Sequence, residues 1–137
     1  MTESIAVPER PWDKVHTIHD RDGLWPLHGL ADLDGKPHFY ARQFDAERDE
    51  WSEILLLMPA ESELVALEME RWALWLRWKG AFDLRQSTHA AAHERYYGLR
   101  AELGDRWRPQ PERSRRMTGQ FRDTRGPDPW VQWTPVE

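Results

Sequence analysis

One stretch decides most of the predicted fold, and it reads His28-Gly29-Leu30-Ala31-Asp32-Leu33-Asp34-Gly35-Lys36-Pro37-His38-Phe39. The Asp34-Gly35 pair stands between two strand-like runs, and both residues tolerate the positive φ angles of a type I′ turn. The register that follows from this turn pairs Leu33 with Lys36, Ala31 with His38 and Leu30 with Phe39. The sequence therefore predicts an antiparallel hairpin of residues 28–33 and 36–44.

A third strand is predicted for residues 51–58, after a polar loop. Its run Ile54-Leu55-Leu56-Leu57-Met58 is apolar on both faces, which is typical of a strand that is covered on both sides. The sequence thus predicts a three-stranded meander for residues 24–58. Residues 1–23 sustain no periodicity, so we expect an irregular lead-in before the meander.

The most unusual feature is a helix predicted for residues 63–82, which carries three of the nine tryptophans of the chain. At 100° per residue its apolar side chains form two neighbouring stripes. One stripe comprises Leu64, Leu67, Trp75, Trp78 and Phe82, and the other comprises Val65, Met69, Trp72 and Leu76. The strip that suits water is narrow and consists of Glu63, Ala66, Glu70, Ala73 and Arg77. So wide an apolar arc needs cover on two sides.

A second helix is predicted for residues 88–103, between Thr88 as N-cap and Gly104 as C-cap. Residues 61–104 thus contribute two helices, and residues 105–137 contribute an arginine-rich connector and a C-terminal hairpin. We expect a single α+β domain of 137 residues. In this expectation a small antiparallel sheet, made of the three-strand meander plus the C-terminal hairpin, packs against the two helices.

Composition excludes several classes of protein. Hydrophobic residues make up 39% of the chain and charged residues 31%, which is typical of a folded globular protein. The chain has no cysteine, so it has no disulfide, thiol nucleophile or cysteine-based zinc site. Neither a phosphate-binding glycine loop nor a serine nucleophile motif occurs. We expect a cytoplasmic protein with no membrane association and no cofactor.

Several short motifs recur together in residues 25–83. They are the run from Gly29 to Phe39, the pair Phe44-Asp45, the run Asp49-Glu50-Trp51-Ser52, the run Leu57-Met58-Pro59 and the helix with Trp72 to Trp78. In these motifs the chain resembles a group of short uncharacterised bacterial proteins. The resemblance implies a bacterial origin and a shared fold, and it carries no catalytic residue to this chain.

Histidine and aspartate gather in the first 38 residues. His28 and Asp32 share one face of the first hairpin strand, because they are four residues apart at a period of two. A hydrolase that uses metal or acid–base assistance would need His16 or His19 to lie beside them. The favoured interpretation is that these residues are turn-forming aspartates and partly buried histidines.

His89 and His93 form a second candidate, because they lie four residues apart on one face of the second helix. That spacing suits zinc. The sequence offers no obvious third ligand, however, so the favoured interpretation is a solvated surface without a metal.

The charge of the chain is unevenly distributed. The net charge is −5, yet residues 106–125 contain seven arginines and only two acidic side chains. Arg108, Arg113, Arg115 and Arg116 are therefore candidates for binding an anion or a nucleic-acid backbone, with Trp107 placed to stack on a base. The favoured alternative is a basic tail that folds onto an acidic body.

The leading functional hypothesis is a non-enzymatic protein-interaction module of the immunity, antitoxin or accessory type. It would bind a protein partner, or a second copy of itself, through the tryptophan helix, because tryptophan is enriched in interfaces. The residues assigned to this surface are Arg71, Trp75, Trp78 and Phe82. The alternatives are the hydrolase that uses His28 and Asp32 and nucleic-acid binding through the arginine-rich tail.

Overall fold

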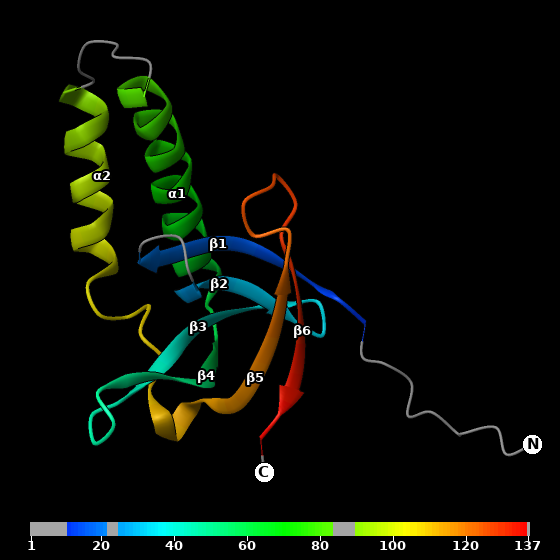
Figure 1. The fold of residues 1–137 in the computed structure, drawn as a ribbon. Coiled ribbons are helices and arrows are strands. Elements are labelled where there is room, and N and C mark those ends of the chain that lie inside the picture. Colours follow the sequence, from blue (N-terminus) through cyan, green and yellow to red (C-terminus); the bar gives the residue numbers. More distant parts are fainter. Residues whose placement is uncertain (1–10, 22–24, 84–89, 137) are drawn as a thin grey trace, which may run out of the picture.

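The computed structural model describes residues 11–21, 25–83 and 90–136, and the side chains of residues 20, 21, 25 and 78–93 lie outside that description. Within these described residues, six strands, two α-helices and one short 3-10 helix follow each other in sequence (Figure 1). They are β1 (Asp13–Arg21), β2 (Trp25–Leu33), β3 (Lys36–Asp45), β4 (Glu50–Pro59), α1 (Ser62–Asp83), α2 (Ala90–Leu103), η1 (Pro111–Arg113), β5 (Arg115–Arg122) and β6 (Trp130–Pro135).

The six strands pair antiparallel in chain order and close into a barrel, because β6 returns to β1. The closing contact is short. It pairs Asp13 with Val131 and Lys14 with Trp130, and the Val15 amide donates to the Pro129 carbonyl at 3.0 Å. The expected open sheet packed against two helices is therefore wrong: the fold is a closed six-stranded antiparallel barrel, with a helical hairpin inserted between β4 and β5.

Strand β1 explains the error, since its residues were expected to form an irregular lead-in. Its pairing with β2 shifts register between Val15 and Thr17, so inward and outward side chains do not simply alternate along the sequence. In addition, His16 and His19 contact carboxylates of the protein and are only partly exposed. A strand whose outer side chains are polar but covered lacks the hydrophobic period of two that identifies strands in sequence.

The β2–β3 hairpin has the predicted register. Leu33 pairs with Lys36 and Leu30 with Phe39, and both turn residues adopt positive φ, 53° at Asp34 and 77° at Gly35. The Asp13 carboxylate accepts hydrogen bonds from both turn amides, at 3.2 and 3.1 Å. Strand β1 thus secures the hairpin turn from outside.

Strand β4 is covered on both faces, as its apolar run predicted. Leu55 and Leu57 belong to the barrel core, while Leu56 and Met58 are buried on the opposite face. The barrel core also contains the indole of Trp133, which is 1% exposed and donates a hydrogen bond to the Asp32 carbonyl at 2.9 Å.

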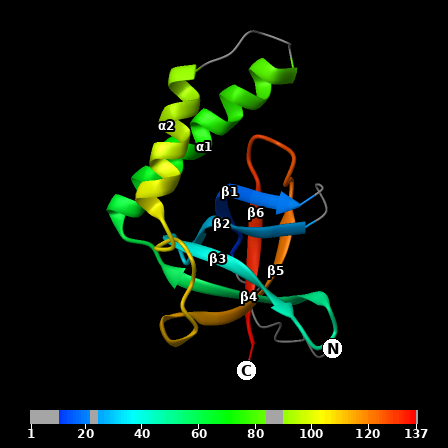
Figure 2. The same cartoon turned by 90° about the vertical axis from the view of Figure 1, so that its left-hand side faces the viewer.

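A second apolar cluster attaches the helices to the outside of the barrel. Leu64 at the start of α1 and Leu103 at the end of α2 pack against Leu30 and Phe39. The two helices lie side by side and extend away from the barrel beyond this attachment (Figures 1 and 2). The helical hairpin is therefore attached to the barrel near the start of α1 and the end of α2.

Both helices have bounds close to the predicted ones. Gly104, with φ of 50°, ends α2 as expected, whereas the predicted N-cap Thr88 lies outside the described residues. All five α1 residues that were assigned to water, from Glu63 to Arg77, are exposed. Within the described part of the chain, neither helix is long and apolar enough to cross a membrane.

The contact between β1 and β2 requires the absence of a side chain at Gly29. A Cβ there would lie 2.2 Å from the Thr17 carbonyl oxygen and 2.7 Å from the Tyr40 hydroxyl. We expect Gly29→Ala to destabilise the protein by about 1–3 kcal/mol in urea unfolding, because β1 must move away from β2.

Gly98→Ala is the matched control. Gly98 is exposed on α2, and a Cβ there would meet nothing within 4 Å. Alanine has the higher helix propensity, so we expect this change to stabilise the protein by up to about 1 kcal/mol. Equal effects of the two substitutions would contradict the close approach at Gly29.

Candidate functional site

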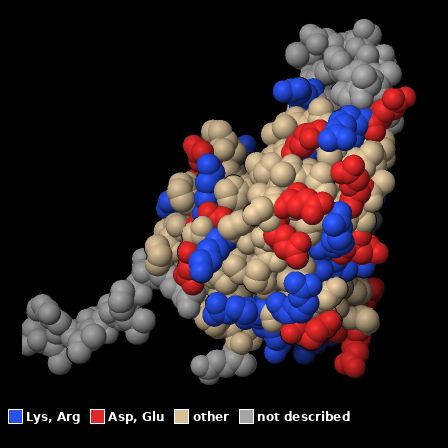
Figure 3. Space-filling view, turned by 180° about the vertical axis from the view of Figure 1, so that it is seen from behind, with Lys and Arg blue, Asp and Glu red and all other residues tan. Residues whose placement is uncertain are grey.

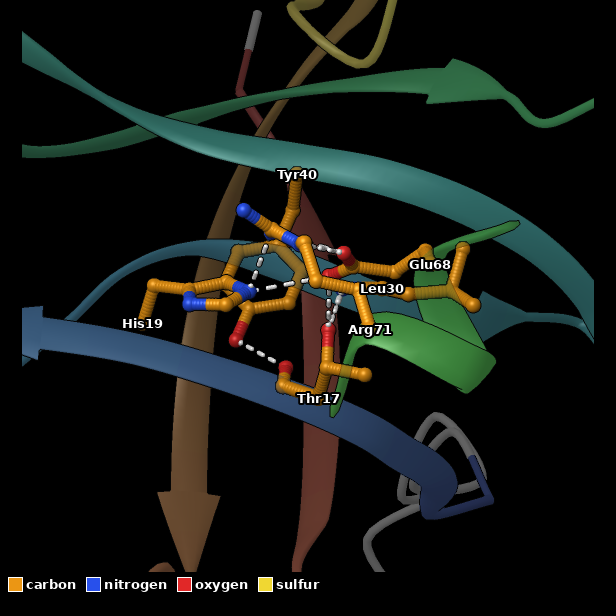
Figure 4. Close-up of polar contacts among 6 residues, drawn as sticks. All are labelled: Thr17, His19, Leu30, Tyr40, Glu68 and Arg71. Atoms are coloured by element: carbon orange, nitrogen blue, oxygen red, sulfur yellow. Dashed lines mark hydrogen bonds and ion pairs between the residues drawn. The ribbon is translucent and has the colours of Figure 1, made fainter. Parts of the chain in front are cut away.

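Glu68 is the most buried charged residue of the described chain, with 1% of its surface exposed. It lies on α1 one turn after Leu64, and its carboxylate points at β1 (Figure 4). Thr17 donates a hydrogen bond to Oε2 at 2.7 Å, and Arg71 Nε donates one to Oε1 at 2.9 Å. Arg71 Nη2 forms an ion pair with the same Oε1 atom at 2.7 Å. Both carboxylate oxygens are therefore satisfied inside the protein.

Thr17 links this carboxylate to the barrel. Its hydroxyl accepts a hydrogen bond from the Leu30 amide at 2.9 Å, and its carbonyl accepts one from the Tyr40 hydroxyl at 2.9 Å. A polar chain thus runs from Tyr40 in the barrel core, through the wall at Thr17, to Glu68 on the helix (Figure 4).

His19 lies between the two charged groups of α1. Its Nε2 atom is 2.9 Å from Glu68 Oε2 and 2.8 Å from Arg71 Nη2. A ring nitrogen donates when it carries a proton and accepts when it does not, so it makes only one of these hydrogen bonds at a time. The His19 and Trp72 rings meet edge to face, with 5.4 Å between their centroids. Trp72 therefore covers another side of this cluster.

The electrostatics of Glu68 favour the ionised form. Burial by itself would raise the pKa of the Glu68 carboxyl, but the hydrogen bonds and positive charges supplied by His19, Arg71 and Thr17 outweigh it and lower the pKa below its ordinary value. Glu68 is therefore a carboxylate at neutral pH, and Arg71 is its counter-ion.

His28 pairs with His19 across the strands and stacks between two rings. Its ring centroid is 4.7 Å from that of His19 and 4.4 Å from that of Trp107. Burial is the main cause that lowers the pKa of His28 to about 3, and repulsion from neighbouring cationic groups adds to it. His28 is thus neutral at physiological pH, and its ring nitrogens make no hydrogen bond to any residue that the structure describes.

His19, His28 and Arg71 line one wall of a pocket between the barrel and the end of α2, with a volume of about 450 Å³. The opposite wall comes from Arg100 on α2 and from the segment that follows the helix, which contributes Asp105, Trp107 and Arg108. The Arg108 guanidinium lies 5.3 Å from the centroid of the Trp107 ring. Three guanidinium groups, those of Arg71, Arg100 and Arg108, therefore border one small pocket.

Arg100 and Arg108 differ from Arg71 in their partners. Both are exposed, and within the described residues neither forms a hydrogen bond or an ion pair with a carboxylate. Their N–H groups are available to a ligand. Arg71, in contrast, is 8% exposed and is held by Glu68.

The four residues that were candidates for a hydrolase site form two separate pairs in the structure. His16 Nε2 lies 2.9 Å from Asp32 Oδ1, and His19 stacks on His28. Since His28 and Asp32 are four residues apart along β2, the two pairs are about 13 Å apart. His19 and His28 line the pocket, whereas His16 and Asp32 do not.

The metal candidates give no site in the described chain. His89 and the side chain of His93 both lie outside the described residues. Among the residues that the structure does describe, no group of three or more histidine, aspartate or glutamate side chains is arranged to hold a metal ion.

Of the residues assigned to a partner surface, the structure describes the side chains of Arg71 and Trp75. Arg71 is buried at the pocket, and Trp75 packs against Tyr96 of α2 with 6.4 Å between the ring centroids. The side chains of Trp78 and Phe82 lie outside the described residues. Part of the tryptophan arc is thus covered by the second helix of the same chain.

The arginine-rich tail is also divided. Arg108 lines the pocket, whereas Arg113 in η1 and Arg115 and Arg116 in β5 are exposed elsewhere. None of these four forms an ion pair with a carboxylate of the described chain. Figure 3 shows basic and acidic side chains interspersed over the rear face, with basic ones gathered along its lower part.

Several residues of this site were not selected from the sequence, and Glu68 and Arg100 are among them. The available signal was that Glu68 lies four residues after Leu64 and seven before Trp75, within an apolar line of the helix. A carboxylate in such a line, with Arg71 three residues later, indicates a buried ion pair. Arg100 carries no comparable signal.

Comparison with protein-family models, with curated proteins and with solved structures found no match. The resemblance to short bacterial proteins therefore stays a prediction. The function of the pocket is inferred below from its own geometry and charge.

The lowered pKa of His28 predicts a loss of stability at mildly acidic pH. As the pH falls below 6.5, the unfolded chain binds a proton at His28 and the folded chain does not, so the free energy of unfolding decreases. Between pH 6.5 and 5 this one residue should account for about 2 kcal/mol. His28→Gln should remove that part of the loss in urea unfolding at pH 7 and pH 5.

His16→Gln is the control for this measurement, since it replaces a histidine of the same sheet that lies outside the pocket. The control should keep the loss that is due to His28. If His28→Gln and the parent chain lose the same free energy between the two pH values, then His28 is not a neutral, buried imidazole.

Proposed function

We propose that the pocket between the barrel and the helical hairpin binds a small ligand that carries a phosphate-like or sulfate-like oxyanion, and that the chain is a ligand-binding module. The observation that carries this proposal is the convergence of Arg71, Arg100 and Arg108 on one pocket. Guanidinium groups donate paired hydrogen bonds to the oxygens of such anions.

The charge balance of the pocket supports an anion. Glu68 offsets the charge of Arg71 by direct contact, and Asp105 is the acidic residue among those that line the pocket. The three arginines and these two carboxylates together leave the pocket with one more positive than negative charge. Arg100 and Arg108 have no competing carboxylate within the described chain, so an incoming anion does not have to displace one.

The size and the neutral imidazole of the pocket support a small ligand. A volume of about 450 Å³ lies within the range of small-molecule sites. His28 offers a ring N–H donor and a lone pair without adding charge, because its pKa is lowered to about 3 by burial. The same low pKa makes His28 a weak base at neutral pH, so binding has more support than hydrolysis.

Nucleic-acid binding through Arg113, Arg115 and Arg116 has less support. The net charge of the chain is −5, which opposes a long polyanion. Trp107, which was placed to stack on a base, already contacts His28 and Arg108.

Titration calorimetry with sulfate tests the proposed function. The parent chain should show saturable binding, and Arg100→Ala or Arg108→Ala should each weaken it roughly tenfold through the loss of a charged hydrogen-bond donor. Both arginines are exposed, so their replacement should leave the unfolding transition unchanged.

Arg113→Ala and Arg116→Ala are matched controls, because they remove exposed arginines that do not line the pocket. Their affinity should equal that of the parent chain. Equal losses in all four variants would indicate a general effect of net charge, and the absence of saturable binding in the folded parent chain would contradict the proposal.

A second candidate is the protein-interaction module that the sequence favours, and one observation supports it. On the second apolar stripe of α1, Met69 is 37% exposed and Leu76 is 50% exposed. They lie two helical turns apart on one face. A partner protein of the immunity, antitoxin or accessory type, or a second copy of the chain, would cover this face. A cytoplasmic location, which the sequence favours, is proposed together with this candidate.

Native mass spectrometry of the pure protein tests self-association through this stripe. A dimer is expected for the parent chain, and Leu76→Glu should convert it to a monomer because a carboxylate would be placed in an apolar interface. Phe44→Glu is the control, since Phe44 is 48% exposed but lies on β3. A parent chain that stays monomeric at high concentration would leave this candidate without support.

A further inference from the structure

Strands β4 and β5 pair with each other over only part of their length. The ladder between them ends at the pair of Ile54 and Thr118. Beyond this pair β5 continues beside β6, while β4 continues beside β3 (Figure 1). Within the described chain, residues 50–53 of β4 and residues 119–122 of β5 therefore have no strand partner on the edges that face each other.

An irregularity in β4 explains why the ladder ends. Between the pair of Arg42 with Leu55 and the pair of Phe44 with Trp51, β3 advances by two residues and β4 advances by four. The additional residues of β4 form a β-bulge, and a bulge bends the strand that contains it. The bend thus begins next to Ile54, where the pairing with β5 stops.

The unpaired edge of β5 presents hydrogen-bonding groups of the main chain. The Val136 amide donates to the Arg116 carbonyl at 3.0 Å, so Arg116 belongs to a hydrogen-bonded pair with the chain of β6. Such pairs involve every second residue of an antiparallel ladder. The N–H and C=O groups of Gly119 and Phe121 therefore point away from β6, and among the described residues they have no hydrogen-bond partner on that side.

This edge lines a pocket of about 460 Å³ that shares no residue with the anion pocket, and we call it the edge pocket. Four consecutive residues of β5 line it, from Thr118 to Phe121, together with Glu53 of β4. Consecutive side chains of a strand point to opposite faces, so the feature that these four residues share is the edge of the main chain. The half-buried Phe121 ring packs against the barrel core and marks the inner face.

The charges of the edge pocket favour an uncharged ligand. Arg42 and Glu53 are the charged residues among those that line it, and their charges balance. Arg42 also donates to the Pro26 carbonyl at 3.1 Å and to the Ser52 carbonyl at 3.0 Å, so the protein itself holds its guanidinium. The edge pocket thus offers main-chain groups and an aromatic ring without a net charge.

We infer that the edge pocket binds an extended, uncharged segment of a partner polypeptide, which adds to β5 as an antiparallel strand. Gly119 and Phe121 are two residues apart, about 7 Å along the strand, and the hydrogen-bonding groups of a second extended chain repeat at the same distance. The ligand residues opposite Gly119 and Phe121 exchange hydrogen bonds with them, and their side chains lie on the inner face beside the Phe121 ring. Apolar side chains at these alternate positions fit the site.

The pentapeptide acetyl-Thr-Val-Thr-Val-Thr-amide is the probe, because it is uncharged, favours extended structure and carries apolar side chains at alternate positions. In nitrogen-15 amide spectra of the full chain, the Gly119 and Phe121 signals should shift with a saturable dependence on probe concentration. Their hydrogen exchange should slow by about tenfold when the probe is present at ten times its Kd. No response of these two amides to the probe would overturn the inference.

Two N-methylated versions of the probe are matched controls that leave the protein unchanged. Methylation of both valine nitrogens should abolish binding, because these N–H groups face β5. Methylation of the central threonine nitrogen should leave binding in place, because that N–H group faces away from β5. Equal effects of the two modified peptides would overturn the assignment to strand addition.

Hydrogen exchange in the free chain tests whether the edge is open. The Gly119 and Phe121 amides should exchange faster than those of Thr118 and Gln120, which bond to β6. Slow exchange that is lost on dilution would show that a second copy of the chain covers the edge, and slow exchange at every concentration would show that the chain covers it itself. Either result would overturn the inference. Sulfate should leave these amides unchanged, so the outcome is independent of the proposed function.

Discussion

The buried carboxylate of Glu68 is the constraint on which the rest of this structure depends. A carboxylate without partners in a protein interior is strongly destabilising, so α1 can lie on the barrel only where donors surround it. Thr17 and Arg71 donate to Glu68, and His19 lies within hydrogen-bond distance. Thr17 in turn needs the hydroxyl of Tyr40 and the missing side chain at Gly29. The barrel wall and the helix are thus built around one charge.

The same network gives the pocket its properties. Arg71 is fixed by Glu68 and so presents its guanidinium in a defined position, as ligand recognition requires. The stacking of His28 between His19 and Trp107 holds a neutral imidazole beside it. Exposed arginines complete the opposite wall. The pocket therefore combines a buried, ion-paired arginine of α1 with exposed arginines of α2 and of the segment that follows it, and the interactions that stabilise the fold also position the proposed site.

The candidate site could be predicted only in part. The sequence drew attention to His19, His28 and Arg108, because histidines are dense near the start of the chain and arginines near its end. It placed them in different hypotheses, since nothing in their spacing shows that the end of α2 returns to the outer face of β2. Trp75 of α1 was assigned to a partner surface, and it contacts Tyr96 of the same chain.

The sequence by itself determined the elements whose signals are local. The register of the β2–β3 hairpin follows from the positive φ angles that Asp34 and Gly35 permit, the two-sided burial of β4 from its apolar run, and the end of α2 from Gly104. Only the tertiary structure decided that the sheet closes and that a pocket forms. Closure depends on β1, whose outer side chains are polar and whose register shifts at Thr17, so no periodic signal marks it. The burial of Glu68 likewise depends on donors that lie 51 and 49 residues away in the chain, and local patterns carry no information about such distant partners.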